Sequence, residues 1–167
     1  LFVDESGIVW SGTFTGGINK FDPYKAKFGH VKSDPEDREN TLSNNMVLSF
    51  LVDSQKQLWV GTMAGLNRID PDSGEVEQYM GNPGDPYALP DGVVGAWLED
   101  QFGDICIGSY GGLSHFNPES GHFDSYIYNP NDPDGLAYPI VLDLFEDSSG
   151  DFWVATGGRG FDKFDRD

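Results

Sequence analysis

The sequence is poor in cysteine, in basic residues and in long apolar runs. Its single cysteine, Cys106, excludes an intrachain disulfide framework and a metal site built from several thiolates. No apolar run approaches the roughly 18 residues that a membrane-spanning helix needs. Ten Lys and Arg stand against 28 Asp and Glu, and the formal net charge of -18 repels nucleic-acid phosphates and anionic lipid headgroups. We therefore expect no nucleic acid partner and no direct membrane binding by this segment.

Large apolar side chains are nevertheless abundant. The chain is 38% hydrophobic and 14% aromatic, which is too much for a disordered segment. Twenty-two Gly and 10 Pro stand in short clusters and predict many short elements joined by turns. A length of 167 residues fits a single domain, so we treat residues 1–167 as one segment.

The chain repeats itself with a period of about 47 residues. Successive members of the tryptophan series are 49, 47 and 47 residues apart, and an aspartate series keeps the same intervals. A leucine series in the connecting stretches follows at intervals of 47 and 47. The three series are Trp10, Trp59, Cys106 and Trp153; Asp4, Asp53, Asp100 and Asp147; and Leu42, Leu89 and Leu136. Such a period predicts a repeat architecture.

Each repeat is predicted to contain four strands, because Gly, Asp, Asn and Pro clusters bound short runs of β-forming residues. In the second repeat these strands are 46–53, 57–62, 65–70 and 75–80. The first of them is nearly continuously apolar and is expected to be covered on both faces. Four short strands and a recurring Trp in about 47 residues are typical of a β-propeller blade.

The sequence therefore predicts an all-β chain made of β-propeller blades, each a four-stranded antiparallel sheet. The last repeat lacks an outer strand, so we expect the segment to be part of a larger propeller. Its partners would be the remaining blades or another copy of itself. The predicted blades are 1–45, 46–92, 93–139 and an incomplete 140–167.

Glycines mark the expected hairpin turns. Asp-x-x-Gly recurs at 4–7, 100–103 and 147–150, where the Gly is free to adopt a positive φ. In the second repeat Lys56 stands in that place, which predicts a turn of different shape. Further glycines, among them Gly157 and Gly158, are expected to open the third strand of each repeat.

The residues resemble a known family. Leu58-Trp59-Val60-Gly61-Thr62 followed by Gly65-Leu66-Asn67-Arg68-Ile69-Asp70-Pro71 is similar to the signature of the two-component regulator propeller repeat. Residues 9–13 with 17–23, and 152–156 with 160–165, resemble further copies, while Cys106 and Asn117 are departures in the third repeat.

That resemblance implies a function. The family occurs in sensory regions of bacterial hybrid histidine kinases and of some membrane-bound diguanylate cyclases. It therefore implies a periplasmic or otherwise extracytoplasmic sensor, whose catalytic effector domain lies outside this chain. It does not imply a particular ligand, because families of repeats share blades and differ in what they bind.

No catalytic or metal-binding set is evident. The histidines occupy solvent-facing or variable polar positions of the repeat, and Cys106 is interpreted as a smaller buried residue in the place of a Trp. The aspartate series has a sufficient explanation as turn residues, and the Asp-rich stretch 129–135 has Pro130 where a calcium ligand would be needed. We expect no catalytic residues, no metal and no cofactor. The histidines are His30, His115 and His122.

Candidate ligand-binding residues lie where neighbouring loops differ while the core repeats. Loops between the second and third strands, and the links between blades, form one face of a propeller. A further carboxylate, Asp143, stands on an inner strand where Ser49 and Ala96 are its equivalents. The candidates are Phe14, Met63, Tyr110 and Arg159 in the loops, Asn44, Asp91 and Tyr138 in the links, and Asp143.

Three functions remain open from the sequence. The favoured one is a non-catalytic sensing segment that binds a small molecule or a carbohydrate, a neutral sugar being insensitive to the negative charge. The second is a propeller-type lyase or hydrolase, for which Asp91, Asp143 and Tyr138 are the plausible starting residues. The third is a structural module for receptor assembly.

Overall fold

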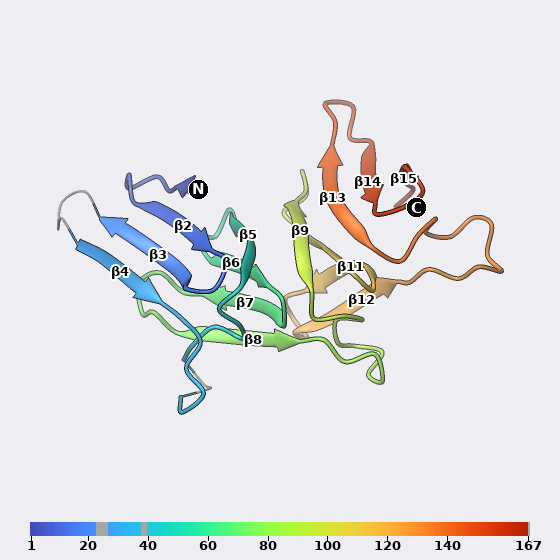
Figure 1. Cartoon of the computed structure of the whole chain (residues 1–167). Coiled ribbons are helices and arrows are strands. Elements are labelled where there is room, and N and C mark those ends of the chain that lie inside the picture. The colour runs from blue at the N-terminus through green and yellow to red at the C-terminus, as the bar shows by residue number, and fades with distance from the viewer. Residues whose placement is uncertain (23–26, 38–39, 167) are drawn as a thin grey trace. The chain divides into compact units, whose positions relative to one another are not determined.

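All regular elements of the described residues are β-strands (Figure 1). The computed structural model describes residues 1–22, 27–37 and 40–166. Within those ranges no helix has the length and apolarity needed to cross a membrane. The strands are β1 (Phe2–Val3), β2 (Val9–Thr13), β3 (Gly17–Asp22), β4 (Lys27–Val31), β5 (Val47–Val52), β6 (Leu58–Thr62), β7 (Gly65–Ile69), β8 (Val76–Met80), β9 (Val94–Glu99), β10 (Ile105–Ser109), β11 (Gly112–Asn117), β12 (His122–Tyr126), β13 (Val141–Glu146), β14 (Phe152–Thr156) and β15 (Phe161–Phe164).

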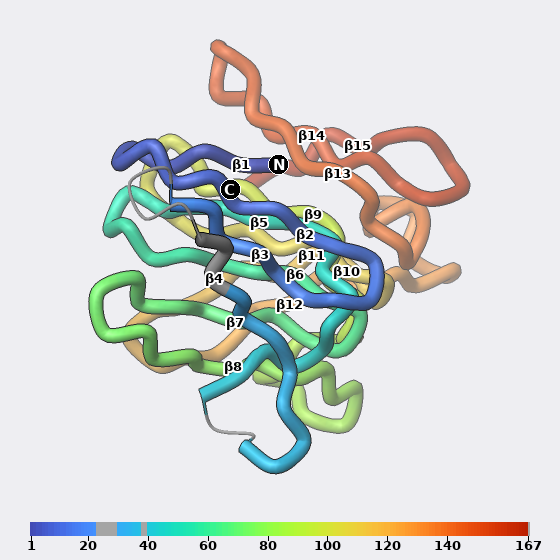
Figure 2. Tube along the Cα trace, turned by 60° about the vertical axis from the view of Figure 1, so that its left-hand side comes forward, coloured from blue at the N-terminus to red at the C-terminus, as the bar shows by residue number. Residues whose placement is uncertain are grey.

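The strands form one sheet in each repeat. Sheets β1–β4, β5–β8 and β9–β12 have four strands and sheet β13–β15 has three, each ordered along the chain as an antiparallel meander. The register repeats as well, because the tryptophan series always pairs with a basic residue of the third strand. These pairs are Trp10–Lys20, Trp59–Arg68, Cys106–His115 and Trp153–Lys163. The predicted all-β, blade-by-blade architecture is confirmed, and Figure 2 follows the trace through it.

Two compact units make up the chain, Leu1–Tyr79 and Met80–Asp167. We call them the N-terminal and the C-terminal unit, and each has its own apolar core. In the N-terminal unit Trp10 and Ile18 of the first sheet pack with Leu58, Val60 and Ile69 of the second. In the C-terminal unit the core joins the third sheet to the fourth through Ala96, Cys106, Leu113, Val141, Leu144, Phe152 and Val154.

The expectation that the first strands are covered on both faces is wrong for β5 and β13, whereas no residue of β9 is exposed. Leu48, Leu142 and Phe145 are exposed despite the apolar run around them. The register explains two of them, because β5 shifts between Val47 and Ser49 and β13 shifts between Val141 and Asp143. The extra residue of each bulge, Leu48 or Leu142, is left outside the alternation that would bury it.

The turn at Lys56 has the same shape as its glycine counterparts, so the prediction of a different turn is wrong. Lys56 has a φ of 67°, against 80° for Gly7, 86° for Gly103 and 84° for Gly150. Its N–H donates to the carbonyl of Asp53 at 2.9 Å, as the glycine N–H does in the other three turns. The Asp53 carboxylate also accepts the N–H of Gln57 at 2.8 Å. These bonds hold a lysine in a left-handed conformation that costs about 1 kcal/mol.

We therefore expect Lys56→Gly to raise the free energy of unfolding by about 1 kcal/mol, because glycine adopts this φ without steric strain. Urea denaturation of the two proteins measures the difference. As a matched control, Gly103→Ala in the equivalent turn should destabilise by a similar amount. A Lys56→Gly protein less stable than the parent would contradict the assignment of strain to this turn.

Candidate functional site

One end of every second strand is closed by a hydroxyl side chain. The Thr62 hydroxyl donates to the Gly65 carbonyl at 2.9 Å and accepts the Ala64 N–H at 3.1 Å. The same pair of bonds is made by Thr13, Ser109 and Thr156 in the other repeats. This feature was missed in the sequence, although the four residues keep the repeat intervals. It gives the loops after the second strands a common anchor.

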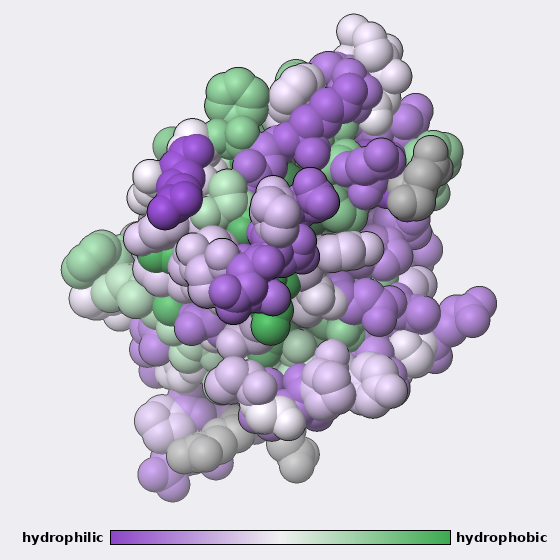
Figure 3. Space-filling view, turned by 90° about the vertical axis from the view of Figure 1, so that its right-hand side faces the viewer, coloured by the Kyte–Doolittle hydropathy of each residue, from purple (hydrophilic) through white to green (hydrophobic). Residues whose placement is uncertain are grey.

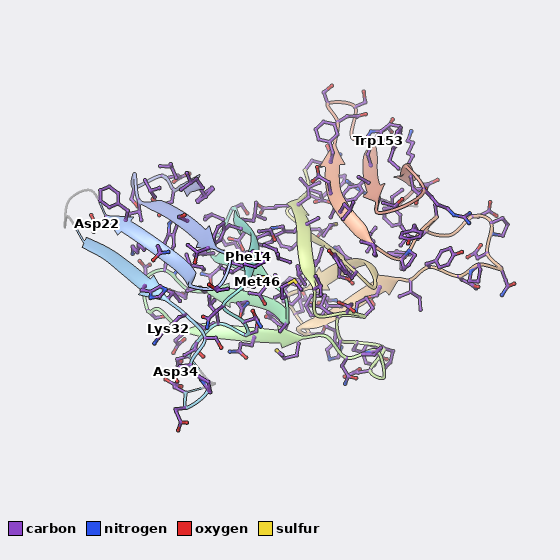
Figure 4. The ribbon with its side chains drawn as sticks, in the orientation of Figure 1. Phe14, Asp22, Lys32, Asp34, Met46 and Trp153 are labelled. Atoms are coloured by element: carbon purple, nitrogen blue, oxygen red, sulfur yellow. The ribbon has the colours of Figure 1, made fainter. Side chains whose placement is uncertain are left out.

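In the N-terminal unit the structure gathers three predicted residues at one rim. The loops carrying Phe14 and Met63 flank the link at Asn44, because Gly17 donates its N–H to the Asn45 carbonyl at 2.8 Å and Met63 donates to the Met46 carbonyl at 3.1 Å. Phe14 is 78% exposed at the tip of its loop (Figure 4). The Asn44 side chain already accepts the N–H of Met46 at 2.7 Å, so it also fixes the start of the next strand.

In the C-terminal unit the same backbone bonds bring loops and links together. Tyr110 donates its N–H to the Val93 carbonyl at 3.1 Å, and Gly157 donates to the Ile140 carbonyl at 2.9 Å. Asp91 caps the N–H of Val93 at 2.7 Å, as Asn44 does in the N-terminal unit. The Tyr138 ring lies against Gly158, where an added Cβ would come within 3.0 Å of the ring. Four predicted residues, Asp91, Tyr110, Tyr138 and Arg159, thus belong to one rim of this unit.

Arg159 and Asp143 of the C-terminal unit differ in their contacts. Arg159 is exposed, and within the described ranges its guanidinium has no ionic partner. Asp143 is exposed on β13, and its carboxylate accepts the N–H of the adjacent Leu144 at 3.0 Å. The prediction that Gly157 and Gly158 open the third strand is wrong, because β15 begins at Phe161 and Gly160 is the residue with positive φ. The anchor hydroxyl and the glycine that it binds are four residues apart here, as in the first repeat, and three apart in the second and third.

The other end of the second strand is fixed by the aspartate series. In the first, second and fourth repeats, one oxygen of the carboxylate accepts backbone N–H groups of the hairpin turn, and the other accepts the indole N–H of the tryptophan six residues later. The Nε1–Oδ2 distances are 2.9 Å for Trp10–Asp4, 2.8 Å for Trp59–Asp53 and 3.0 Å for Trp153–Asp147. The predicted turn role of the aspartates is confirmed, and the bond to the indole is a further role that the shared period of the two series could have indicated.

These hydrogen bonds lower the pKa of the carboxylates. For Asp147 the main cause is the bond from the Trp153 indole, followed by the backbone bond from Ser149. For Asp4, burial raises the pKa, but the combined bonds from Trp10, Ser6 and Ile8 outweigh it and the pKa is lowered. Both groups are therefore held in the charged form that the turn requires.

Burial of the tryptophan series is not uniform. Trp10, Trp59 and Cys106 are 6%, 2% and 7% exposed, as predicted. Trp153 is less completely buried than these three. The difference follows from the sheet: Trp59 stacks on Tyr79 at the end of β8, at 6.1 Å between ring centroids, whereas sheet β13–β15 has three strands. Trp153 instead meets Phe161 edge-on at 5.7 Å.

The third repeat departs from this arrangement. Cys106 has no indole to offer, and Asp100 is paired instead with Arg166, whose Nη1 lies 3.3 Å from Oδ2. Arg166 also binds Glu146 at 2.8 Å and lies over the Phe152 ring at 4.8 Å. It stands two residues after Phe164, where Pro71 follows Ile69 in the second repeat. A guanidinium from the fourth repeat thus replaces the missing indole N–H.

A pocket of about 680 Å³ opens beside this replacement, wholly within the C-terminal unit. Sequence reasoning did not find it, although the single substitution in the tryptophan series was the available signal. We call it the Trp slot of the third repeat. It is lined by Pro86, Asp100, Asp104, Cys106, Leu113, Ser114, His115, Asp124, Ser125, Tyr126, Phe164 and Arg166.

Cys106, His115 and Asp124 form one cross-strand row in this pocket, a set of residue types that thiol enzymes use. The chemistry does not fit. Burial raises the pKa of the Cys106 thiol to about 12, whereas a nucleophilic cysteine needs a lowered pKa. His115 is directed to Asp104, with 3.5 Å between Nε2 and Oδ2. Within the described part of the chain, no three His, Cys, Asp or Glu side chains are grouped to hold a metal ion.

The burial difference predicts unequal mutational effects. Trp59→Ala should lower the free energy of unfolding by about 3 to 5 kcal/mol, because a fully buried indole and its hydrogen bond are lost. Trp153→Ala should cost clearly less, because that ring is only half-buried. Chemical denaturation measures both, and equal losses would contradict the packing described here.

The Asp147 pKa gives a pH prediction. Since the folded-state pKa is lowered below the usual 3.8, this group stabilises the fold above about pH 4 and that contribution is lost as the pH falls through the folded-state pKa. Trp153→Phe removes the main cause and should raise the Asp147 pKa toward 3.8, so that stability declines less steeply in acid. Carbon-detected NMR titration of the carboxyl reports it, with Asp4 as the internal control, and an unchanged Asp147 pKa would contradict the assignment.

Comparison with known proteins identifies the repeats. Residues 41–64 and 135–158 match the family model of the two component regulator propeller. A histidine kinase, P4, of Formosa agariphila is 32% identical over 82 residues, which are 46% of this chain and 6% of that protein. The chain therefore spans only a small part of this relative.

Solved structures share the fold. A protein from B. thetaiotaomicron, named as the extracellular domain of a hybrid two-component system, has a TM-score of 0.77 and 24% identity over 96% of this chain and 21% of its own. Virginiamycin B lyase from Staphylococcus aureus has a TM-score of 0.64 and 16% identity over 98% of this chain and 53% of its own. The chain therefore has a β-propeller fold, and two of its segments match the two component regulator propeller.

Proposed function

We propose that this chain is a non-catalytic, ligand-sensing propeller segment of an extracytoplasmic receptor in a two-component system. The observation that carries the proposal is the contrast between constant and variable positions at the rim. The hydroxyl anchor at the end of the second strand recurs in all four repeats. The side chains displayed beside it do not recur, being Phe14, Met63, Tyr110 and Arg159.

A binding face requires loops whose backbone is fixed and whose exposed side chains can differ. The anchors fix the loop backbone, so the exposed side chains can differ without disturbing the fold. Phe14, Met63 and Tyr110 are all exposed apolar or aromatic residues, and Arg159 is an exposed cation. The proposed ligand contacts are the predicted residues, taken for each unit separately. In the N-terminal unit they are Phe14 and Met63 with the Asn44 link, and in the C-terminal unit they are Tyr110, Arg159, Tyr138 and Asp143 with the Asp91 link.

The relatives favour a sensor over the other readings. One is named as a histidine kinase and another as the extracellular domain of a hybrid two-component system. By analogy the effector domain lies outside this chain, in a larger protein whose further blades are its partners. That arrangement also supports an extracytoplasmic location.

The enzymatic alternative rests on likeness to a lyase that shares the fold at 16% identity. The contacts of Asp91 and Asp143, two of the residues considered for catalysis, do not support this alternative. Asp91 is bonded to the backbone of Val93, and Asp143 is bonded to the backbone of Leu144. Catalysis needs a base within hydrogen-bonding reach of its substrate and a matched acid, and neither carboxylate is brought to the other by a described contact.

The net charge of the chain limits the chemical class of ligand that it can bind. A formal net charge of -18 disfavours the approach of an anion, and hydrophilic side chains cover most of the face in Figure 3. A neutral sugar is insensitive to that field and can stack on aromatic rings while it hydrogen-bonds to amides and carboxylates. Tyr110 and Tyr138 offer such rings at one rim of the C-terminal unit. We therefore propose a neutral glycan or a similar small molecule as ligand.

A thermal-shift screen of neutral glycans against the intact protein tests this. We expect at least one glycan to raise the melting temperature, since a ligand that binds only the folded state stabilises it. In the double variant Tyr110→Ala/Tyr138→Ala that shift should disappear, while the melting temperature without ligand changes little. Tyr87→Ala, which removes an exposed tyrosine outside these loops, is the matched control and should keep the shift.

Three outcomes of the screen would each contradict the proposed glycan site in a different way. A shift that survives the double variant would show that this rim is not the binding face. Turnover of a glycan would favour the enzyme, and the absence of any shift across the screen would favour a structural module.

A further inference from the structure

The Trp slot of the third repeat is a second site, distinct from the loop rim and independent of the function proposed there. In the other repeats this position of the sheet is occupied by an indole. Trp59 shows the arrangement: Asp53 accepts its N–H at 2.8 Å, Arg68 lies over it at 5.7 Å and Tyr79 stacks on it at 6.1 Å. The corresponding residues of the third repeat are Asp100, His115 and Tyr126, and Cys106 stands where the ring would be.

Side chains of the neighbouring sheet β13–β15 fill only part of the space that an indole at position 106 would occupy. Phe164 and Arg166 take the positions that Ile69 and Pro71 have in the second repeat, and both are larger. Phe164 meets Tyr126 edge-on at 4.8 Å, and Arg166 satisfies Asp100. About 680 Å³ remains open, which lies within the range of roughly 300 to 1,000 Å³ found for small-molecule pockets.

The lining of the slot indicates the chemistry of its ligand. Its apolar and aromatic lining consists of the buried Cys106 and Leu113, the partly buried Phe164 and the exposed Tyr126, and it suits a flat ring. Its charged groups are the carboxylates of Asp100, Asp104 and Asp124 and the guanidinium of Arg166. Arg166 is paired with Asp100, and Asp104 lies 3.5 Å from His115.

The remaining carboxylate is available. Among the described residues the exposed Asp124 side chain has no hydrogen-bonding or ionic partner, whereas Glu77, its counterpart in the second repeat, is bound by Arg68 at 2.6 Å. The shorter His115 in the place of Arg68 is directed to Asp104 instead. A positive charge is therefore missing beside Asp124, and an indole is missing beside Cys106.

We infer that the Trp slot binds a flat aromatic ring that carries a positively charged amine, with the ring beside Cys106 and against the Tyr126–Phe164 pair, and the amine at Asp124. Such a ligand supplies both groups that the third repeat lacks. The ring replaces the indole of the tryptophan series, and the amine replaces the basic group that binds Glu77 in the second repeat.

Tryptamine is the probe, and isothermal titration calorimetry of the intact protein is the measurement. We expect saturable binding with a Kd below about 1 mM. Indole-3-acetate has the same ring with a negative charge and should bind at least tenfold more weakly, because the slot is acidic. Glucose, as a neutral sugar, should neither bind there nor compete.

Substitutions locate the site. Cys106→Trp fills the slot with the residue that the other repeats have and should abolish tryptamine binding, whereas Cys106→Ala should retain it. Asp124→Asn should weaken binding roughly threefold to tenfold without changing the melting temperature. Asp134→Asn makes the same charge change at a link residue outside the slot and should have no effect.

The result can overturn the inference in several ways. No saturable tryptamine binding, equal binding of indole-3-acetate, competition by glucose, or unchanged binding by a folded Cys106→Trp protein would each do so. If Cys106→Trp does not fold, the Asp124→Asn and Asp134→Asn pair decides the question. The Tyr110→Ala/Tyr138→Ala protein should bind tryptamine normally, so failure of this site and failure of the glycan site are distinguishable.

Discussion

The aspartate carboxylate at the first hairpin of each repeat is the group on which the rest of the blade depends. One oxygen satisfies the N–H groups of the turn and the other accepts an indole N–H from the second strand. A tight turn and a large buried ring are thereby fixed by one side chain, and the low pKa of Asp4 and Asp147 keeps that side chain charged. Even a lysine with positive φ is tolerated in the turn of the second repeat, because these bonds determine the backbone there.

The third repeat shows how that constraint survives the loss of the ring. The carboxylate of Asp100 is 3% exposed and needs a donor, since a buried charge without a partner is strongly destabilising. Arg166 supplies it from the neighbouring repeat, together with a second bond to Glu146. Arg166 thus restores a hydrogen-bonding partner for Asp100, but it does not fill the volume of the missing indole. The Trp slot is the space that remains. An electrostatic requirement can be met by one guanidinium, but an indole is replaced only by another ring.

The two ends of the second strand have different roles in the blade. The aspartate end couples the turn to the core. The hydroxyl end fixes only the loop backbone, so the side chains beyond it are free of the packing that the repeats share. The side chains of these loops can therefore change without loss of the fold.

By itself the sequence determined the all-β class, the four-sheet register and the loop positions of Phe14, Met63, Tyr110 and Arg159, because strand alternation, turn residues and a fixed period are local signals. It also indicated the turn role of the aspartates. Only the tertiary structure decided what depends on neighbours that are distant in the chain: the exposure of Leu48 and Leu142 at bulges, the half-burial of Trp153 and the shape of the Lys56 turn. The Trp slot belongs to the same class. Cys106 marks its place in the sequence, but only packing of the fourth sheet against the third shows that Arg166 takes over the hydrogen bond and leaves the space open.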